Sequence, residues 1–207
     1  MTRSNRKVIE GEWKIFDQTP YLGTDVYGKT LGLIGLGLIG TAVAKRAKGF
    51  DMDILYHSRT RKPDAEKKYG LRWAPDLDEL LSSSDYISVH VPLGPETQGF
   101  IGSKEIKKMS KDAFLINTSR GGTVDPDALR EALMAGEIAG AALDVTSPEP
   151  ILPDDPLVHM ENVIVTPHIA SASAATLRRM GLMAADNVIK HLKGEAMPAC
   201  LNPEAVG

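Results

Sequence analysis

The chain lacks several features that bear on its cellular location and its partners. It has one cysteine among 207 residues, Cys200, so no disulfide can form within it, and this composition suits a reducing cytoplasm. Its formal net charge is only -3, which gives no reason to expect nucleic acid or an anionic membrane as a partner. From these absences we expect a cytoplasmic protein that binds neither nucleic acid nor membrane.

Long apolar runs and metal-binding patterns are absent as well. The most apolar stretch, residues 30–44, lies between Lys29 and Lys45 and is shorter than the roughly 20 residues that a membrane span needs. Residues 1–13 are polar and contain no apolar core of a secretory signal. The five histidines show no metal-ligand spacing, so we expect no metal. The length allows one good-sized core with extensions, or at most two small domains.

Glycine, by contrast, is concentrated in one apolar stretch. The segment "LGLIGLGLIG", residues 31–40, holds four of the 19 glycines, although glycine weakens both helices and strands. The pattern predicts a strand over Thr30–Ile34, a helix over about Leu38–Lys48, and between them a G-x-G-x-x-G turn formed by Gly35, Gly37 and Gly40. In such a turn the first glycine permits the tight bend, the second lets a pyrophosphate approach the backbone, and the third lets helix and strand pack closely. The helix N-terminus would then face the phosphates of a dinucleotide; a purely structural glycine turn is the alternative.

Strand and helix patterns alternate along the rest of the chain. Strands are expected over residues 52–57, 85–91, 113–119, 140–145 and 162–167, and helices over residues 76–84, 103–109, 125–136 and 172–192. The helix over 125–136 has Asp125 as N-cap, Pro126 at its first position and Gly136 at its end. The alternation, with strands too apolar to have a wet face, predicts an α/β fold with a doubly wound parallel sheet, a Rossmann-type dinucleotide-binding domain. The proline-rich segment 146–156 is the one long loop expected inside the fold, and long loops in such folds are often functional.

The nucleotide preference is predicted from the end of the second strand. In NAD-binding folds, an acidic residue about 20 positions after the glycines binds the ribose hydroxyls. Here "HSRTRK", residues 57–62, has no acidic residue and offers the hydroxyls of Ser58 and Thr60 and the guanidiniums of Arg59 and Arg61. Arginine can hold a 2′-phosphate through paired charge-assisted hydrogen bonds. We therefore expect NADP(H) to be preferred and NAD(H) to be possible, with a solvated basic loop as the alternative.

Three later stretches carry candidate chemistry. The segments "INTSRGG", "LDVTSPEP" and "VTPHIASA" lie at the carboxyl ends of expected strands, where open α/β sheets build their sites. They offer Arg120, Glu149 and His168. Arginine suits a substrate carboxylate, histidine can pass a proton to or from a carbinol oxygen near neutral pH, and a neighbouring carboxylate would orient the histidine and favour its charged form. Spacing alone shows three polar residues in three loops that follow expected strands, and it assigns none of them a role.

Five segments together give a family resemblance: "GKTLGLIGLGLIG", "VPLGPET", "AFLINTSRGGTVDPDAL", "AGAALDVTSPEP" and "VTPHIASAS". From about Glu10 to Pro203, the chain resembles the D-2-hydroxyacid dehydrogenases, and most of all their glyoxylate/hydroxypyruvate reductase branch. The resemblance implies that Arg120 binds the substrate carboxylate, that His168 is the acid/base, and that Glu149 pairs with His168. It places Asp144 at the nicotinamide carboxamide, and Ala170 replaces a glycine of that branch. The further cofactor positions that it implies are Gly35, Gly37, Leu38, Ile39, Gly40, Ser58, Arg59, Thr60, Val91, Pro92, Thr97, Thr118, Ser119, His168 and Ser171.

The resemblance also implies an organisation. Family members build a second, substrate-binding domain from a long N-terminal segment and the C-terminal tail, and this chain is expected to lack nearly all of that N-terminal segment. We expect a helix remnant and dimerisation arm over residues 1–27, the dinucleotide-binding domain over 28–193 and the tail over 194–207. The arm carries Trp13, Phe16, Tyr21 and Tyr27, and aromatics in an irregular segment suit an interface, so a homodimer is expected. The alternative is an arm that folds back on its own core.

Three functions fit these observations. The first is NADP-dependent reduction of a small 2-oxoacid, glyoxylate or hydroxypyruvate, to the 2-hydroxyacid, with poor turnover expected because the closed cleft would lack the wall that the missing N-terminal segment builds. The second is a dehydrogenase for another acid such as phosphoglycerate; formate matches less well, because hydride abstraction from formate needs no acid/base pair. The third is a non-catalytic dinucleotide-binding interaction module. Turnover with a panel of 2-oxoacids, measured beside a cofactor titration, discriminates among them.

Overall fold

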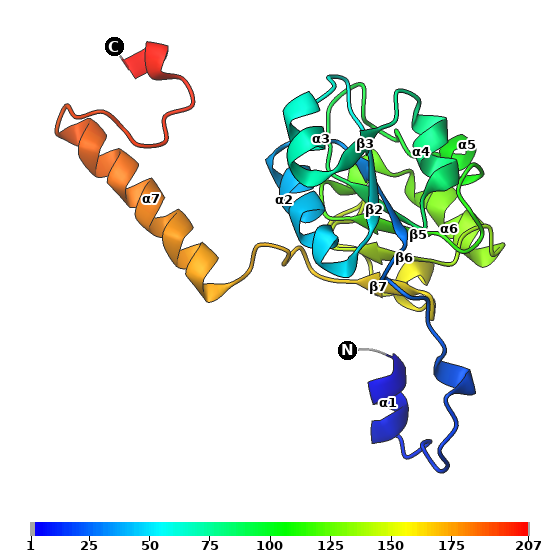
Figure 1. Ribbon diagram of the computed structural model, residues 1–207. Helices are drawn as coiled ribbons and strands as arrows, with labels where there is room; N and C mark the ends of the chain where they lie inside the picture. The colour runs from blue at the N-terminus through cyan, green and yellow to red at the C-terminus, as the bar shows by residue number, and fades with distance from the viewer. Residues whose placement is uncertain (1–2, 207) are drawn as a thin grey trace. The chain divides into compact units, whose positions relative to one another are not determined.

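The computed structural model describes residues 3–206, and it divides the chain into two units, Met1–Pro167 and His168–Gly207 (Figure 1). Residues 1, 2 and 207, which end the two predicted arms, lie outside the described residues. The sheet belongs to the first unit, and the long helix α7 (Ala174–Leu192) belongs to the second. The predicted domain limits at residues 27 and 193 stay predictions.

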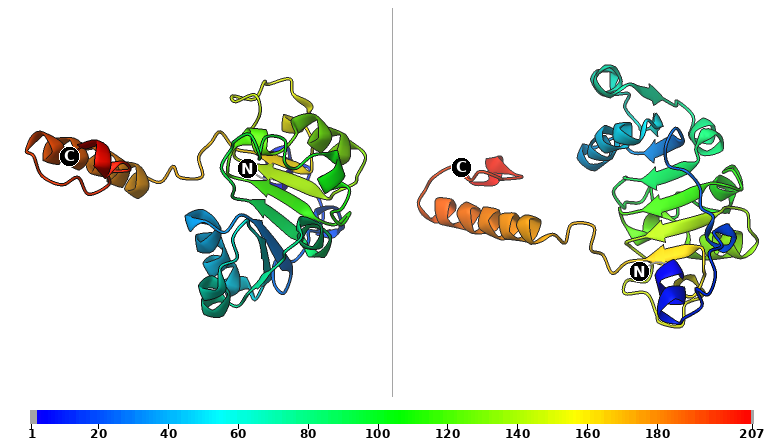
Figure 2. Two further views of the ribbon diagram at one scale, coloured as in Figure 1. Left: turned by 90° about the horizontal axis from the view of Figure 1, so that it is seen from above. Right: turned by 60° about the horizontal axis from the view of Figure 1, so that its bottom comes forward.

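The first unit is built on one seven-stranded parallel sheet. Its strands are β1 (Thr30–Ile34), β2 (Asp53–His57), β3 (Leu71–Trp73), β4 (Tyr86–Val89), β5 (Phe114–Asn117), β6 (Gly140–Leu143) and β7 (Val163–Val165). Their order is β3-β2-β1-β4-β5-β6-β7, every neighbouring pair is parallel, and Figure 2 shows the strands side by side from two further directions. The order reverses direction between β1 and β4, and ligands of open α/β sheets bind outside the strand ends at such a switch point.

Helices cover both faces of the sheet (Figure 1). One face carries α2 (Leu38–Ala47) and α3 (Pro63–Tyr69), and the other carries α4 (Leu77–Ser83), α5 (Ser103–Ile106) and α6 (Pro126–Met134). Each face has its own apolar core, with Leu33 and Tyr56 in the first and Leu80 and Leu115 in the second. The remaining helical segments of the first unit are α1 (Arg3–Ile9) and the short 3-10 turns η1 (Thr19–Tyr21), η2 (Lys48–Phe50), η3 (Gly121–Thr123) and η4 (Pro156–Val158). This arrangement confirms the predicted doubly wound α/β fold.

The sequence explains why these elements form where they do. Strand β1 buries residues on both of its faces because helices cover both, and a Cβ at Gly32 would lie 2.4 Å from the Ser84 hydroxyl oxygen. Helix α6 begins as predicted: the Asp125 carboxylate accepts hydrogen bonds from two amides of the first turn, at 3.0 and 3.1 Å. Pro126 occupies the first helical position, and Gly136 follows the helix with a φ of 65°.

Two elements were not predicted. Helix α3 and strand β3 lie in "PDAEKKYGLRW", residues 63–73, which is strongly charged and has no apolar period. Strand β3 is a three-residue edge strand, so it needs little apolar surface. Helix α5 is also shorter than predicted and ends at Ile106 rather than near Met109. In these segments strand pairing and helix capping decide the structure, and the sequence has no apolar period from which to predict it.

The second unit contains the predicted last helix. Helix α7 begins after Ser173, whose hydroxyl accepts a hydrogen bond from the Thr176 amide at 3.1 Å. After the helix, the Ala199 amide donates to the Asn187 side-chain oxygen at 3.0 Å, and a last 3-10 turn, η5, spans Pro203–Val206. Among residues 3–206, no helix has the length and apolar character that crossing a membrane requires.

Candidate active site

The glycine turn between β1 and α2 has the geometry that its sequence predicted. Gly35 has a φ of +96°, and a Cβ there would lie 2.7 Å from the His90 carbonyl oxygen. A Cβ at Gly40 would lie 2.3 Å from the Gly35 carbonyl oxygen, so glycine lets helix and turn pack closely. Gly37 caps α2, is exposed, and has open space where a Cβ would stand. The turn thus leaves room at the helix N-terminus for a phosphate group, which the free amides there favour.

A cavity of about 820 Å³ lies at the switch point of the sheet. It is lined by residues that follow β1, β2 and β4, and its volume suits a small-molecule or cofactor site. Eight predicted cofactor residues line it: Gly35, Gly37, Ser58, Arg59, Thr60, Val91, Pro92 and Thr97. Among the described residues of the first unit, six predicted ones lie outside the lining: Leu38, Ile39, Gly40, Thr118, Ser119 and Asp144. All of them stay predictions as cofactor contacts.

The wall of this cavity after β2 carries the predicted phosphate-binding loop. The Ser58 hydroxyl donates to the Thr60 carbonyl oxygen at 2.7 Å, which shapes the loop as a tight turn. Arg59 lies 3.5 Å from the Glu96 carboxylate on the opposite wall, and the two side chains are 89% and 81% exposed. Arg61 differs from Arg59 because its guanidinium is bound to Glu66, at 2.8 and 2.9 Å. Of these two arginines, Arg59 lines the cavity and Arg61 does not.

The opposite wall is ordered by Thr97. Its hydroxyl donates to the Pro92 carbonyl oxygen at 2.6 Å and accepts from the Gly94 amide at 2.8 Å. His90 also lines the cavity, although its strand pattern indicated a core residue. It is half-buried, its Nε2 lies 2.9 Å from the Ser88 hydroxyl, and burial lowers its pKa to about 4. His90 is therefore neutral at pH 7. Its position directly after a strand end, where open α/β sheets bind ligands, was the available signal that it lines the cavity.

The turn that carries Arg120 is held by Asn117, which sequence reasoning missed. Asn117 is buried, its side-chain nitrogen donates to the Arg120 carbonyl oxygen at 3.0 Å, and its side-chain oxygen accepts from the Ser119 amide at 3.0 Å. The Thr123 hydroxyl also donates to the Arg120 carbonyl oxygen, at 2.7 Å. The Arg120 side chain itself is exposed and donates to the Ser119 carbonyl oxygen at 2.7 Å. A polar residue at the end of an apolar strand was the available signal for Asn117.

The Arg120 turn packs directly on the segment that leads to Glu149. A Cβ at Gly121 would lie 1.8 Å from the Thr146 carbonyl oxygen, so only glycine fits at this contact. Glu149 follows three residues later on an exposed loop. Asp144, which precedes Thr146, is buried and accepts a hydrogen bond from the Thr166 hydroxyl at 2.6 Å. The first unit therefore brings the turn of Arg120 and the loop of Glu149 together.

His168 is the first residue of the second unit, so its pairing with Glu149 stays a prediction, as does the role of Ser171. Its backbone φ is +53°, which is uncommon for a residue other than glycine. Strained backbone of this kind concentrates at functional sites. Among the described residues, no group of three or more histidine, cysteine, aspartate or glutamate side chains is placed to hold a metal ion.

Comparison with known proteins gives the family. The model of the family described as "D-isomer specific 2-hydroxyacid dehydrogenase, NAD binding domain" matches residues 1–170. The chain belongs to the D-isomer specific 2-hydroxyacid dehydrogenases. The matched part of the chain corresponds to the domain of this family that binds a nicotinamide dinucleotide.

Two similar curated proteins are named as reductases of glyoxylate or hydroxypyruvate. A glyoxylate reductase from Korarchaeum cryptofilum is 50% identical over 207 residues, which are 100% of this chain and 62% of the relative. A glyoxylate/hydroxypyruvate reductase B from Pectobacterium carotovorum is 44% identical, over 100% of this chain and 67% of the relative. The crystal structure of the TT0316 protein from Thermus thermophilus superimposes with a TM-score of 0.90 at 42% identity, over 96% of this chain and 61% of that one. The chain thus spans about three-fifths of the length of several proteins that it matches.

Proposed function

We propose that this chain is the cofactor-binding part of an NADPH-dependent reductase that converts a small 2-oxoacid, glyoxylate or hydroxypyruvate, to the 2-hydroxyacid. The observation that carries the proposal is the contact between Gly121 and Thr146, which seats the turn of Arg120 against the loop of Glu149 within the part of the chain that matches an NAD-binding domain. The names of the two reductase relatives support the choice of substrate.

The chain's own side chains divide the work of the reaction. Arg120 is exposed on a rigid turn, and its guanidinium matches the two oxygens of a substrate carboxylate. His168 donates the proton that the carbonyl oxygen of the 2-oxoacid takes up, and Glu149 orients the imidazole. When bound, the reduced nicotinamide supplies a hydride to the keto carbon. The open helix N-terminus at Gly37 receives the pyrophosphate.

The preference for NADPH over NADH rests on Arg59. Residues 57–62 contain no carboxylate that would repel a 2′-phosphate, and Arg59 projects from the cavity lining with 89% of its side chain exposed. The hydroxyls of Ser58 and Thr60 lie on the same loop. Replacing Arg59 with Asp should weaken NADPH binding by about 10- to 150-fold, since one charge-assisted hydrogen bond of about 1.5–3 kcal/mol is lost. NADH binding should not weaken, because a carboxylate in this loop can accept hydrogen bonds from the ribose hydroxyls.

The test combines binding with turnover. NADPH and NADH are titrated by nicotinamide fluorescence, and NADPH oxidation is followed with glyoxylate, hydroxypyruvate, pyruvate and phosphohydroxypyruvate. We expect tighter NADPH binding and fastest oxidation with the first two acids, and Arg120→Gln should lower kcat/KM at least 100-fold, as loss of a bidentate anchor of about 3 kcal/mol predicts. Arg72→Gln, which removes an exposed arginine bound to Glu79 away from the cavity, is the matched control. Cofactor binding without turnover of any acid would contradict the reductase and support a non-catalytic dinucleotide-binding module.

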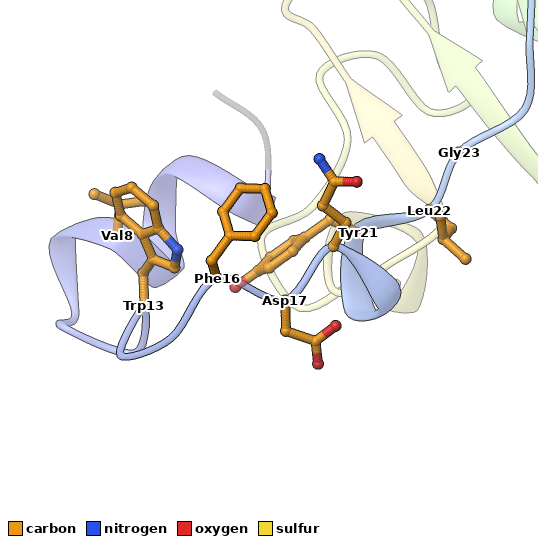
Figure 3. A pocket seen from close by; sticks show the side chains of 8 residues that line it. Val8, Trp13, Phe16, Asp17, Tyr21, Leu22 and Gly23 are labelled. Carbon is orange, nitrogen blue, oxygen red and sulfur yellow. The ribbon is translucent and has the colours of Figure 1, made fainter.

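We also propose a homodimer formed through the arm, residues 3–27. Its side chains are open to solvent in the chain by itself: Trp13, Phe16 and Tyr27 are 62%, 85% and 71% exposed. Figure 3 shows Trp13, Phe16 and Tyr21 around a cavity of about 470 Å³ whose lining lies wholly within the arm. Such aromatics are typical anchors of an interface. Sedimentation equilibrium should report a dimer that Phe16→Asp dissociates, whereas a monomeric parent chain would overturn the proposal. A cytoplasmic setting, which the single cysteine favours, belongs to the same proposal.

A further inference from the structure

The guanidinium of Arg61 is held away from the cofactor cavity. Its Nε and Nη2 atoms donate to the two oxygens of Glu66, at 2.9 and 2.8 Å, in a bidentate pair. The same guanidinium lies over the indole ring of Trp73, 5.3 Å from the ring centre. Of the loop residues 57–62, Arg61 alone does not line the cavity. The arginine that sequence reasoning offered as a second phosphate ligand is therefore engaged on the outer side of the loop.

Glu66 is tied to the sheet as well as to the loop. The hydroxyl of Tyr56, a fully buried residue of β2, donates to a Glu66 oxygen at 2.6 Å. The same hydroxyl accepts a hydrogen bond from the Lys62 backbone amide at 2.7 Å. Lys62 is the last residue of the loop and lines the cavity. Tyr56 and Glu66 thus fasten the far end of the loop to the core, and we refer to Tyr56, Arg61, Glu66 and Trp73 as the Glu66 cluster.

The Glu66 cluster is electrostatically balanced. The Glu66 side chain is only 14% exposed, and its hydrogen bonds from Arg61 and Tyr56 lower its pKa to about 2, so the carboxylate is charged at every pH of a cofactor assay. The Arg61 charge is neutralised by this carboxylate at contact distance. Bidentate arginine–carboxylate pairs fix geometry as well as charge. The cluster is therefore suited to hold a loop in one conformation and is a poor source of positive charge for a ligand.

We propose that Glu66 is a positioning residue for dinucleotide selectivity. The Glu66 cluster fixes the loop of Ser58, Arg59 and Thr60 in the conformation that receives a 2′-phosphate. Arg61 holds this loop in place and is not a phosphate ligand. This inference rests on the proposed NADPH preference and assigns its structural cause. The 2′-phosphate contacts depend on several loop atoms at once, whereas the ribose of NADH needs fewer of them. Loosening the loop should therefore penalise NADPH more than NADH.

The opposite role for Arg61 predicts the opposite sign. If Arg61 were a phosphate ligand held back by Glu66, then Glu66→Gln would release a full positive charge beside the cavity and tighten NADPH binding. If Arg61 instead holds the loop in place, the same substitution removes the carboxylate that binds the Arg61 guanidinium, and NADPH binding weakens. Arg61→Lys separates the two readings too, because lysine keeps the charge but cannot form the bidentate pair.

The experiment measures the dissociation constants of NADPH and NADH by fluorescence titration for the full chain and its variants. Glu66→Gln should lower the preference for NADPH over NADH about ten-fold, equivalent to about 1.4 kcal/mol. Arg61→Lys and Arg61→Gln should give similar losses, and the double variant Arg61→Gln/Glu66→Gln should lose no more than either single one, because both act on one contact. Glu79→Gln is the matched control, since it breaks the exposed Arg72–Glu79 pair outside the cavity lining and should leave both constants unchanged.

Tyr56→Phe gives an independent second measurement. It removes the hydroxyl between Glu66 and the Lys62 amide while leaving the Arg61–Glu66 pair in place, so it should move the NADPH preference in the same direction by a smaller factor. Unchanged ratios in folded Glu66→Gln and Tyr56→Phe proteins, or tighter NADPH binding in Glu66→Gln, would overturn the inference. A parent chain that binds NADH more tightly than NADPH would instead overturn the proposed preference. If the preference for NADPH over NADH falls in Arg59→Asp but not in Glu66→Gln, the proposed NADPH preference stands and the positioning role of Glu66 is rejected.

Discussion

Replacing Gly121 with alanine should damage stability and catalysis together. The φ of Gly121 lies outside the left-handed region, so an alanine meets no conformational penalty there, and the whole effect is steric. The new Cβ would lie 1.8 Å from the Thr146 carbonyl oxygen and 2.1 Å from its carbonyl carbon, whereas ordinary contact begins at 3.4 Å. The obstructing atoms are backbone, so the two segments must separate by about 1.6 Å.

The magnitude follows from that displacement. Overpacking of a well-packed contact costs about 1–3 kcal/mol, and a backbone clash of this depth belongs at the upper end, about 3 kcal/mol. A shift of about 1 Å at a catalytic group can cost about 100-fold in rate. Because the displaced segments carry Arg120 and Glu149, we expect kcat/KM for glyoxylate to fall at least 100-fold. NADPH binding should weaken by a smaller factor, since the cavity wall of Ser58, Arg59 and Thr60 is built elsewhere.

Urea unfolding followed by circular dichroism measures the first effect, and NADPH oxidation measures the second. The matched control is Gly122→Ala, because a Cβ there would meet the end of the flexible Gln98 side chain at 3.1 Å and no backbone atom nearer than that. We expect this variant to lose less than about 1 kcal/mol. A Gly121→Ala protein as stable and as active as the parent chain would refute the close-contact reasoning.

Three further predictions concern single charges. Glu96→Gln should tighten NADPH binding about two- to five-fold without affecting NADH, because the exposed Arg59–Glu96 pair competes with a 2′-phosphate; no change in a titration at low salt would contradict this. Because Arg61 first and Tyr56 second lower the pKa of Glu66 from 4.5 to about 2, its stabilising contribution is complete above pH 4.5 and is lost as pH falls through 2. The melting temperature of Glu66→Gln should therefore fall less steeply between pH 4.5 and pH 2 than that of the parent chain. An equally steep fall in both proteins would contradict the assignment. Asp125→Ala removes the carboxylate that caps α6 and should cost about 1 kcal/mol in urea unfolding, whereas Asp125→Asn should recover most of it.

The elements of the fold followed from local patterns in the sequence. The strand, glycine turn and helix around Gly35 were predictable because each glycine meets a backbone requirement within a few residues of itself. Helix α3 and strand β3 were not, since their sequence is charged and their stability comes from pairing at the sheet edge. Periodicity carries information about buried faces and little about a three-residue edge.

The interactions of the candidate site were less predictable than its residues. Arg120 and Glu149 stood out by chemical type, but the contact of Gly121 with Thr146 joins residues from two different strand ends and needs the folded sheet to appear. The pairing of Arg61 with Glu66 spans a loop and the first turn of α3, and a sequence shows only that both charges are present. Residue type predicts which chemistry is available, and tertiary geometry decides which partner each group takes.

The turn held by Asn117 has a consequence for how substrate choice could change. Its hydrogen bonds end on the carbonyl oxygen of Arg120 and on the amide of Ser119, which every amino acid other than proline supplies. The turn therefore keeps its shape whatever side chain stands at position 120. A library of substitutions there would vary the charge and size presented to a ligand while the scaffold stays constant. The side chain at this position can therefore change at little cost in folding, because the buried Asn117 amide and the exposed Arg120 guanidinium are separate parts of the turn.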